Sequence, residues 1–129
     1  MIDKNIDWDN LGFNAYKTKS MFKAYYSSAT GWQVQGLVPY GNVTLSPAST
    51  ILNYGQGIFE GTKAYKTSKG RVVLFRLEDN EKRFSISSKR MCIPVLPKNL
   101  FSDAVKEVVN DNLDFLPSKD RGSLYVRPI

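Results

Sequence analysis

The most regular hydrophobic pattern in the chain lies between residues 101 and 112. Apolar residues recur there at spacings of three and four, namely Phe101, Ala104, Val105, Val108 and Val109, with Asn112 continuing the series. This spacing places them on one face of an amphipathic helix, for which Asn99 is a candidate N-cap residue. We interpret the face as part of a hydrophobic core.

A second helix is predicted to begin at Leu77, with Lys89 and Arg90 in its last turn. Acidic side chains stand near its start and basic ones at its end, namely Glu78, Asp79, Glu81, Lys89 and Arg90. This order complements the helix dipole, and prolines at positions 94 and 97 then stop the helix. We therefore interpret the carboxylates as partners of the dipole and not as an acid/base pair.

The remaining patterned segments have the composition and alternation of β-strands. The expected strands are residues 20–27, 33–38, 43–45, 61–66, 71–76 and 123–127. The clearest hairpin joins the fourth and fifth of these, because the link 67–70 is polar and ends in glycine. Residues 46–49 are expected to begin one helical turn, and residues 1–19 to form an irregular arm anchored by Ile6, Trp8, Leu11 and Phe13.

This order of strands, two helices and a final strand predicts an α+β fold, with the helices packed on a mainly antiparallel sheet. The length of 129 residues suits one domain, residues 1–129. The final strand runs almost to Ile129 without a cap or tail, from which we expect the natural chain to continue into a further domain.

Composition narrows the classes of function. The hydrophobic content of 42% is that of a globular chain, and no apolar run approaches the roughly 20 residues of a membrane span. The single cysteine, Cys92, and the lack of a basic-then-apolar leader favour the cytoplasm. The formal charge of +6 is spread along the chain without a nucleic-acid-binding motif, so we expect no nucleic-acid partner.

The chain contains no histidine. A Ser-His or Cys-His nucleophile within the chain is therefore excluded, and Cys92 is left as the only soft metal ligand, so we expect no metal site. If the protein is an enzyme, a cofactor is expected to carry the chemistry.

Residues 52–66 carry the candidate binding chemistry. Glycines and aromatic residues are interspersed there, namely Tyr54, Gly55, Gly57, Phe59, Gly61 and Tyr65. The glycine spacing is one residue longer than in the dinucleotide-binding fingerprint, so the pattern alone favours a turn that leads into a hairpin. In an extended segment Phe59 and Gly61 share one face, and a ring beside a missing side chain leaves a notch for a ligand.

Several segments, in the same order, resemble the N-terminal part of branched-chain amino acid aminotransferases, which are fold-type IV enzymes that use pyridoxal 5'-phosphate. The matching segments are residues 45–49, 52–56, 59–65, 74–76, 83–94 and 123–128. The resemblance implies the small N-terminal domain of such an enzyme, with amino acids and 2-oxo acids as substrates. It also implies a homodimer, in which Tyr54 reaches the active site of the other subunit.

The resemblance implies roles for five further residues. Arg76 would bind the cofactor phosphate, to which a guanidinium offers a rigid fork of donors. Phe59 and Gly61 would line the substrate pocket, where a ring beside an open face suits a branched aliphatic side chain. Tyr125 would lie near the α-carboxylate of the substrate, and Arg127 near the distal carboxylate of glutamate.

Two features depart from the family pattern. Where many relatives carry Phe-Thr-Asp-His-Met, this chain has Lys-Thr-Lys-Ser-Met at residues 17–21, so a lysine replaces the ring expected to close the pocket. The Schiff-base lysine and its surrounding motif have no counterpart in the chain, and Lys63, Lys66 and Lys69 are not assigned that role. No catalytic residue is therefore predicted within this chain.

The expected reaction of the complete enzyme is transfer of the α-amino group between leucine, isoleucine or valine and 2-oxoglutarate. We expect the isolated chain to be inactive. Two alternatives stay open. A D-amino acid aminotransferase or aminodeoxychorismate lyase is a rival within the same enzyme class, and a lysine-free relative kept as a binding or interaction module is a rival from another class.

Overall fold

The structure is a computed structural model that describes residues 6–12 and 15–129. Within these residues the strands are β1 (Ser20–Ser27), β2 (Gly31–Pro39), β3 (Thr62–Lys66), β4 (Val72–Leu74) and β5 (Leu124–Val126). The helices are α1 (Thr50–Tyr54), α2 (Leu77–Arg90) and α3 (Leu100–Asp111), followed by the 3-10 turn η1 (Leu113–Phe115). The predicted α+β class is confirmed.

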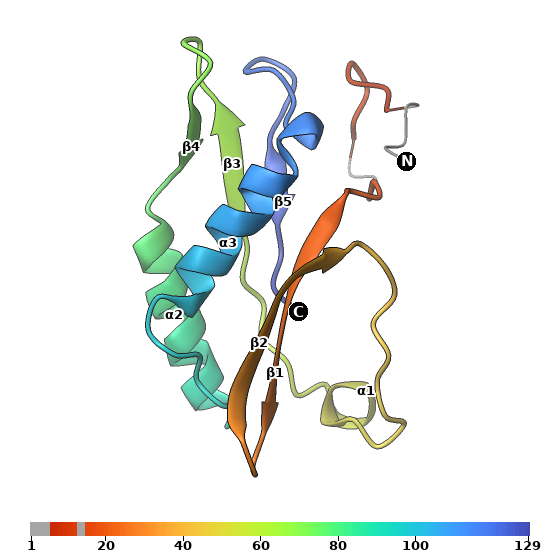
Figure 1. The fold of residues 1–129 in the computed structure, drawn as a ribbon, viewed down its shortest axis with the longest axis vertical. Coiled ribbons are helices and arrows are strands. Elements are labelled where there is room, and N and C mark those ends of the chain that lie inside the picture. The colour runs from red at the N-terminus through yellow and green to blue at the C-terminus, as the bar shows by residue number, and fades with distance from the viewer. Residues whose placement is uncertain (1–5, 13–14) are drawn as a thin grey trace.

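The strands are divided between two antiparallel sheets (Figure 1). β1 pairs with β2, and β3 is the central strand of a second sheet in the order β4-β3-β5. Both outer strands of that sheet run antiparallel to β3. The antiparallel pairing was expected, but strand periodicity does not specify partners, so the division into two sheets is seen only in the structure.

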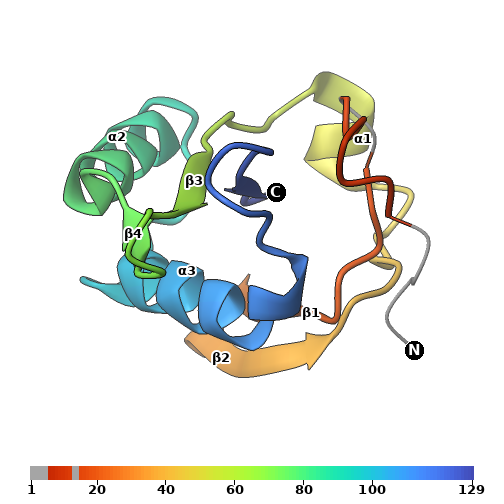
Figure 2. The same ribbon diagram turned by 90° about the horizontal axis from the view of Figure 1, so that it is seen from above.

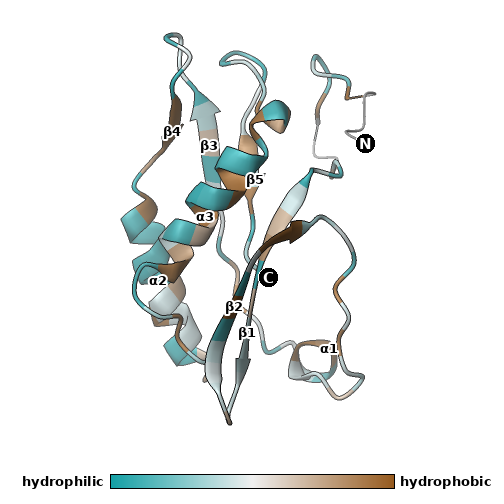
Figure 3. Ribbon diagram, viewed as in Figure 1, coloured by the Kyte–Doolittle hydropathy of each residue, from teal (hydrophilic) through white to brown (hydrophobic). Residues whose placement is uncertain are grey.

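Helix α3 lies between the two sheets and, within the described residues, supplies three of the six buried residues of the core cluster. Phe101, Val105 and Val109 on its predicted apolar face are each 4% exposed and pack with Ala64 of β3 and Leu77 of α2. Figure 2 shows α3 between the β1–β2 hairpin and the second sheet, and Figure 3 shows hydrophilic and hydrophobic residues alternating around the helix. Each such buried side chain stabilises the fold by about 1.5–3 kcal/mol.

Asn112 ties the end of α3 to the start of β1. The residue is 1% exposed. The Oδ1 of Asn112 accepts hydrogen bonds from the backbone N–H groups of Lys19 and Ser20, at 2.9 and 3.1 Å. Its Nδ2 donates to the Oγ of Ser20 at 2.9 Å. The Lys19 side chain also pairs with Asp111, at 2.5 Å. Asn112, the polar residue that ends the predicted apolar series, is thus buried and joins α3 to β1 through hydrogen bonds.

Several predicted boundaries differ from the structure. Residues 43–45 form no strand, since no neighbouring strand pairs with them, and α1 follows the turn expected at 46–49. The strand predicted from residue 61 begins at Thr62. Asn99 does precede α3, but its side chain makes no capping hydrogen bond. The expected anchors Ile6, Trp8 and Leu11 are half-buried, whereas Phe13 lies outside the described residues.

Candidate functional site

The antiparallel order of the second sheet brings distant segments together at one of its ends. β3 begins at Thr62, while β4 ends at Leu74 and β5 ends at Val126, which pairs with Thr62. The segments that precede β3 and follow β4 and β5 are therefore neighbours at this end. These segments contain residues 59–61, 75–76 and 127.

Strand alternation separates the core face of this sheet from its open face. Thr62 and Ala64 of β3 are buried, and Ala64 belongs to the core cluster around α3. Side chains at alternate positions point the opposite way, which places Gly61 on the open face together with Tyr125 and Arg127 of the β5 segment. We call the surface formed by Phe59, Gly61, Tyr125 and Arg127 the site face.

The four residues of the site face are in close contact. The Tyr125 ring lies over Gly61, where a Cβ atom would stand 2.2 Å from the Oη of Tyr125, so this ring fills the notch that the sequence predicted beside Phe59. The guanidinium carbon of Arg127 lies 4.0 Å from the centre of the Phe59 ring, in a cation–π contact. Phe59 is 71% exposed and Tyr125 is 46% exposed, so both rings are open to a ligand or to further protein. The structure thus brings together four of the six predicted site residues.

Arg76 stands at the same end of the sheet, directly before α2. It has a left-handed backbone (φ 51°), and its side chain is 69% exposed and paired with Asp79. An exposed pair of this kind contributes at most about 1 kcal/mol, so a phosphate can displace Asp79. A guanidinium beside a helix N-terminus favours a dianion through its donors and through the helix dipole. Arg76 therefore fits the phosphate of the expected cofactor.

Tyr54 stands apart from the other five predicted residues. It ends α1, which lies away from β3 in both Figure 1 and Figure 2, and it is 84% exposed. The segment after α1 is tied to the end of α2 by a hydrogen bond from the Nε2 of Gln56 to the carbonyl oxygen of Met91, at 2.8 Å. The role of Tyr54 across a subunit boundary stays a prediction.

A buried carboxylate adjoins the site face. Glu60 is 3% exposed, and its Oε1 accepts hydrogen bonds from the backbone N–H of Gly61 at 2.8 Å and from the Nδ2 of Asn80 at 3.0 Å. Arg83 donates two hydrogen bonds to Glu60, from Nε to Oε2 at 2.7 Å and from Nη2 to Oε1 at 2.6 Å. Burial raises the pKa of Glu60, but the hydrogen bonds from Arg83, Gly61 and Asn80 outweigh burial and hold the pKa below its ordinary range.

The sequence did not identify Glu60 or Arg83 as site residues, although it contains a signal. Glu60 lies two and four residues before Thr62 and Ala64, and alternate side chains of an extended segment share a face, which predicts a Glu60 side chain directed to the core. A buried carboxylate needs a paired cation, which an arginine of a neighbouring helix can supply. The pattern does not say which arginine, because the pairing depends on the packing of α2.

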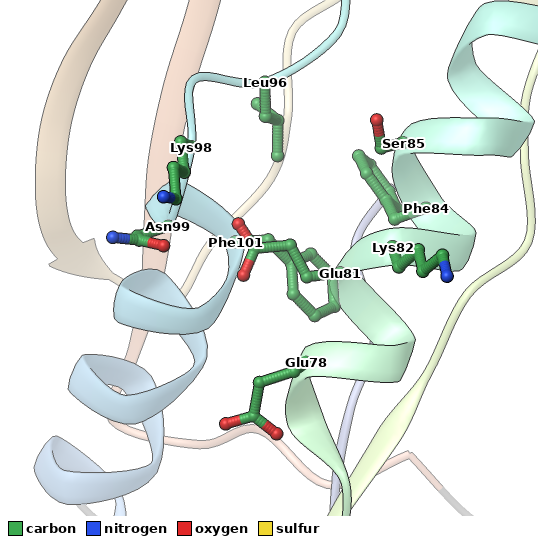
Figure 4. Close-up of a pocket in the computed structure, with 9 residues that line it drawn as sticks. All are labelled: Glu78, Glu81, Lys82, Phe84, Ser85, Leu96, Lys98, Asn99 and Phe101. Atoms are coloured by element: carbon green, nitrogen blue, oxygen red, sulfur yellow. The ribbon is translucent and has the colours of Figure 1, made fainter.

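A separate cavity of 430 Å³ lies between α2 and α3 (Figure 4). It is lined by Glu78, Glu81, Lys82, Phe84, Ser85, Leu96, Lys98, Asn99 and Phe101. Its apolar part includes Phe84 and Phe101, whose ring centres are 5.3 Å apart, and charged side chains surround them. None of the six predicted site residues lines this cavity, and we assign no function to it.

Two further properties concern residues 6–12 and 15–129. No group of three or more histidine, cysteine or carboxylate side chains is gathered there in a way that would hold a metal ion. No helix in these ranges has the length and apolar character needed to cross a membrane.

Comparison with known proteins shows close relatives of one kind. The chain is 43% identical over 125 residues to branched-chain amino acid aminotransferase 1, mitochondrial, of Humulus lupulus, and 47% identical over 126 residues to branched-chain-amino-acid aminotransferase 1, mitochondrial, of Arabidopsis thaliana. Each alignment covers 97% of this chain and 32% or 33% of the relative.

A bacterial relative gives the same result. The chain is 42% identical over 122 residues to branched-chain-amino-acid transaminase 1 of Bacillus subtilis, an alignment that covers 95% of this chain and 34% of the relative. The chain therefore spans about a third of the length of the curated relatives that it matches. No family model matches the chain. The resemblance found in the sequence is confirmed.

Proposed function

We propose that this chain, a homologue of the branched-chain amino acid aminotransferases, supplies the phosphate-binding arginine and one wall of the substrate pocket of such an enzyme. The complete enzyme would transfer the α-amino group between leucine, isoleucine or valine and 2-oxoglutarate. The observation that carries the proposal is the meeting of Phe59, Gly61, Tyr125 and Arg127 on one face, from the segment before β3 and the segment of β5, which are distant in the sequence.

Each residue of the site face has a task that its chemistry supports. The ring of Phe59 and the ring of Tyr125, which packs against Gly61, offer an apolar surface that suits a branched aliphatic side chain, for which one methylene is worth about 1 kcal/mol. The hydroxyl of Tyr125 can donate a hydrogen bond to a carboxylate. The guanidinium of Arg127, held against the Phe59 ring, can pair with a second carboxylate such as that of glutamate.

The proposed cofactor is pyridoxal 5'-phosphate, which when bound supplies an electron sink for the substrate carbon that loses its proton. Arg76 would hold its phosphate. The lysine that bonds to the cofactor is proposed to lie in a part of the enzyme outside this chain, so the isolated chain is proposed to be inactive.

The assembly and the compartment are further parts of the proposal. The exposed Tyr54 is consistent with a homodimer in which this ring enters the partner's site. The cytoplasm stays the predicted compartment on the basis of composition, while several plant relatives are named as mitochondrial or chloroplastic proteins.

The proposal is tested by joining this chain to the part of the Bacillus subtilis relative that the alignment leaves uncovered. We call this fusion the joined enzyme. Transamination of 2-oxoglutarate with leucine as amino donor is the expected result, with the intact Bacillus protein as positive control and this chain alone as negative control.

The other outcomes of that assay identify the rivals. A preference for D-alanine as amino donor would indicate a D-amino acid aminotransferase, and lyase activity on aminodeoxychorismate would indicate the second enzyme alternative. A joined enzyme that folds and binds the cofactor but transaminates no donor would favour an interaction module over an enzyme.

A further inference from the structure

Glu60 links the site face to helix α2. In sequence it stands between Phe59 and Gly61, which both belong to the site face, yet its own carboxylate is buried on the core side of the sheet. Arg83 of α2 reaches this carboxylate with two hydrogen bonds, while the Arg83 side chain remains 62% exposed. A bidentate pair of this geometry fixes direction as well as distance.

Asn80 completes the link. Its Nδ2 donates to the Oε1 of Glu60 at 3.0 Å and to the carbonyl oxygen of Gly61 at 3.2 Å. The backbone N–H of Gly61 donates to the same carboxylate at 2.8 Å. Gly61 precedes β3, so side chains and not the strand ladder hold both of its backbone polar groups.

The position of this short segment decides the shape of the site face. Gly61 touches the Tyr125 ring so closely that a methyl group does not fit between them. Phe59, which precedes Glu60 in the sequence, is in contact with Arg127, whose guanidinium carbon lies 4.0 Å from the centre of the Phe59 ring. A shift of the Glu60 backbone would therefore move both contacts together.

We propose that Glu60 is a positioning residue that fixes the substrate wall by tying residues 59–61 to α2 through Arg83 and Asn80. This inference rests on the proposed function, since the site face is a substrate wall only in an aminotransferase. The task requires a carboxylate held by an arginine. A glutamine at position 60 would set an NH2 group against the donors of Arg83, and a lysine at position 83 has no fork of two parallel donors.

The kinetic test uses the joined enzyme with the substitutions Glu60→Gln and Arg83→Lys. The matched control is Asp103→Asn, which removes a carboxylate from an exposed pair with Lys106, 3.9 Å away on α3. We expect kcat/KM for leucine, normalised to bound cofactor, to fall roughly tenfold or more in Glu60→Gln and less in Arg83→Lys, because small misplacements of binding groups are costly. The Asp103→Asn enzyme should stay within about twofold of the wild type.

The split between stability and kinetics separates positioning from a merely structural role. A carboxylate that only stabilised the packing of α2 would lower the Tm on substitution but leave the kcat and KM of the folded enzyme unchanged. That result would overturn the inference. If Glu60→Gln fails to fold, Arg83→Lys decides the same question, because it keeps the charge opposite Glu60.

A second readout does not depend on activity. In NMR spectra of the joined enzyme, the side-chain protons of Arg127 should be shifted upfield by the ring current of Phe59 in the wild type and in Asp103→Asn. Glu60→Gln and Arg83→Lys should reduce this shift, and an unchanged shift in both would overturn the inference. A wild-type enzyme that shows the shift but does not transaminate leucine would instead overturn the proposed function alone.

Discussion

Replacing Gly61 by alanine adds one methyl group to the tightest contact of the site face. The added Cβ would lie 2.2, 2.6 and 2.7 Å from the Oη, Cζ and Cε2 atoms of Tyr125. An ordinary contact is 3.4 Å or longer, so the Oη must retreat by about 1.2 Å. Gly61 is not one of the glycines with a positive φ, so alanine adds no backbone strain there. The perturbation is therefore steric.

The cost in stability is expected to be small. Overpacking a closed core costs about 1–3 kcal/mol, but Tyr125 is 46% exposed and its ring can swing towards solvent. Alanine also restricts the unfolded chain, which stabilises by about 0.4–1 kcal/mol. The free energy of unfolding should thus change by less than about 1 kcal/mol. The displaced Tyr125 should lower kcat/KM for leucine by about 10–100-fold, because a misplacement near 1 Å costs about 100-fold.

Gly41→Ala is the matched control. Gly41 also lacks a positive φ, and among the described residues its added Cβ would have one neighbour within 4 Å, the carbonyl oxygen of Pro39 at 3.9 Å. Urea unfolding and leucine transamination of both joined enzymes are compared with the wild type. An unchanged kcat/KM in Gly61→Ala would refute the claim that the position of the Tyr125 ring against Gly61 shapes the substrate wall. A loss of more than about 3 kcal/mol would refute the claim that the ring can move aside.

Three further predictions follow from contacts within the described residues. Asn112→Ala should lower the free energy of unfolding by about 2–3 kcal/mol in urea denaturation, because the buried backbone N–H of Ser20 and the part-buried N–H of Lys19 lose their acceptor. The exposed Asn110→Ala should change it by less than about 0.5 kcal/mol. Because the pKa of Glu60 is lower in the folded state than in the unfolded chain, its ionised carboxylate stabilises the fold. This stabilisation is fully present above the ordinary glutamate pKa of 4.5 and is lost as the pH falls through the lowered pKa of the folded state. Unfolding measured against pH should show this acid loss in the wild type and a smaller one in Glu60→Gln, and equal slopes would contradict the assignment. Arg76→Gln in the joined enzyme should weaken cofactor binding by about 10–100-fold in an absorbance titration, with the exposed Arg71→Gln as the unaffected control.

Sequence patterns located the elements whose periodicity is long. The charge order predicted the start of α2 at Leu77 and its last turn at Lys89 and Arg90, and the apolar series predicted the buried face of α3. The short segments were less well determined. Residues 43–45 resemble a strand in composition, but a strand exists only where a partner pairs with it, and pairing is a property of the whole chain.

The candidate site was accessible to sequence reasoning only in part. The resemblance pointed to Phe59, Gly61, Tyr125 and Arg127, and the register of β3 and β5 then showed that they meet. The Glu60–Arg83 pair was missed, because the two residues lie on different elements and no local pattern couples them. A pair between a buried carboxylate and an arginine of another element depends on tertiary packing.

The proposal that the cofactor-bonding lysine lies outside this chain is tested most directly by an intact-mass spectrum. This chain alone and the joined enzyme are each incubated with pyridoxal 5'-phosphate and reduced with borohydride, which makes a lysine adduct permanent. We predict no stoichiometric adduct on this chain, and a single adduct in the joined enzyme on a lysine outside residues 1–129. A stoichiometric adduct confined to one peptide of this chain, such as that containing Lys63, would contradict the assignment of the cofactor-bonding lysine to another part of the enzyme.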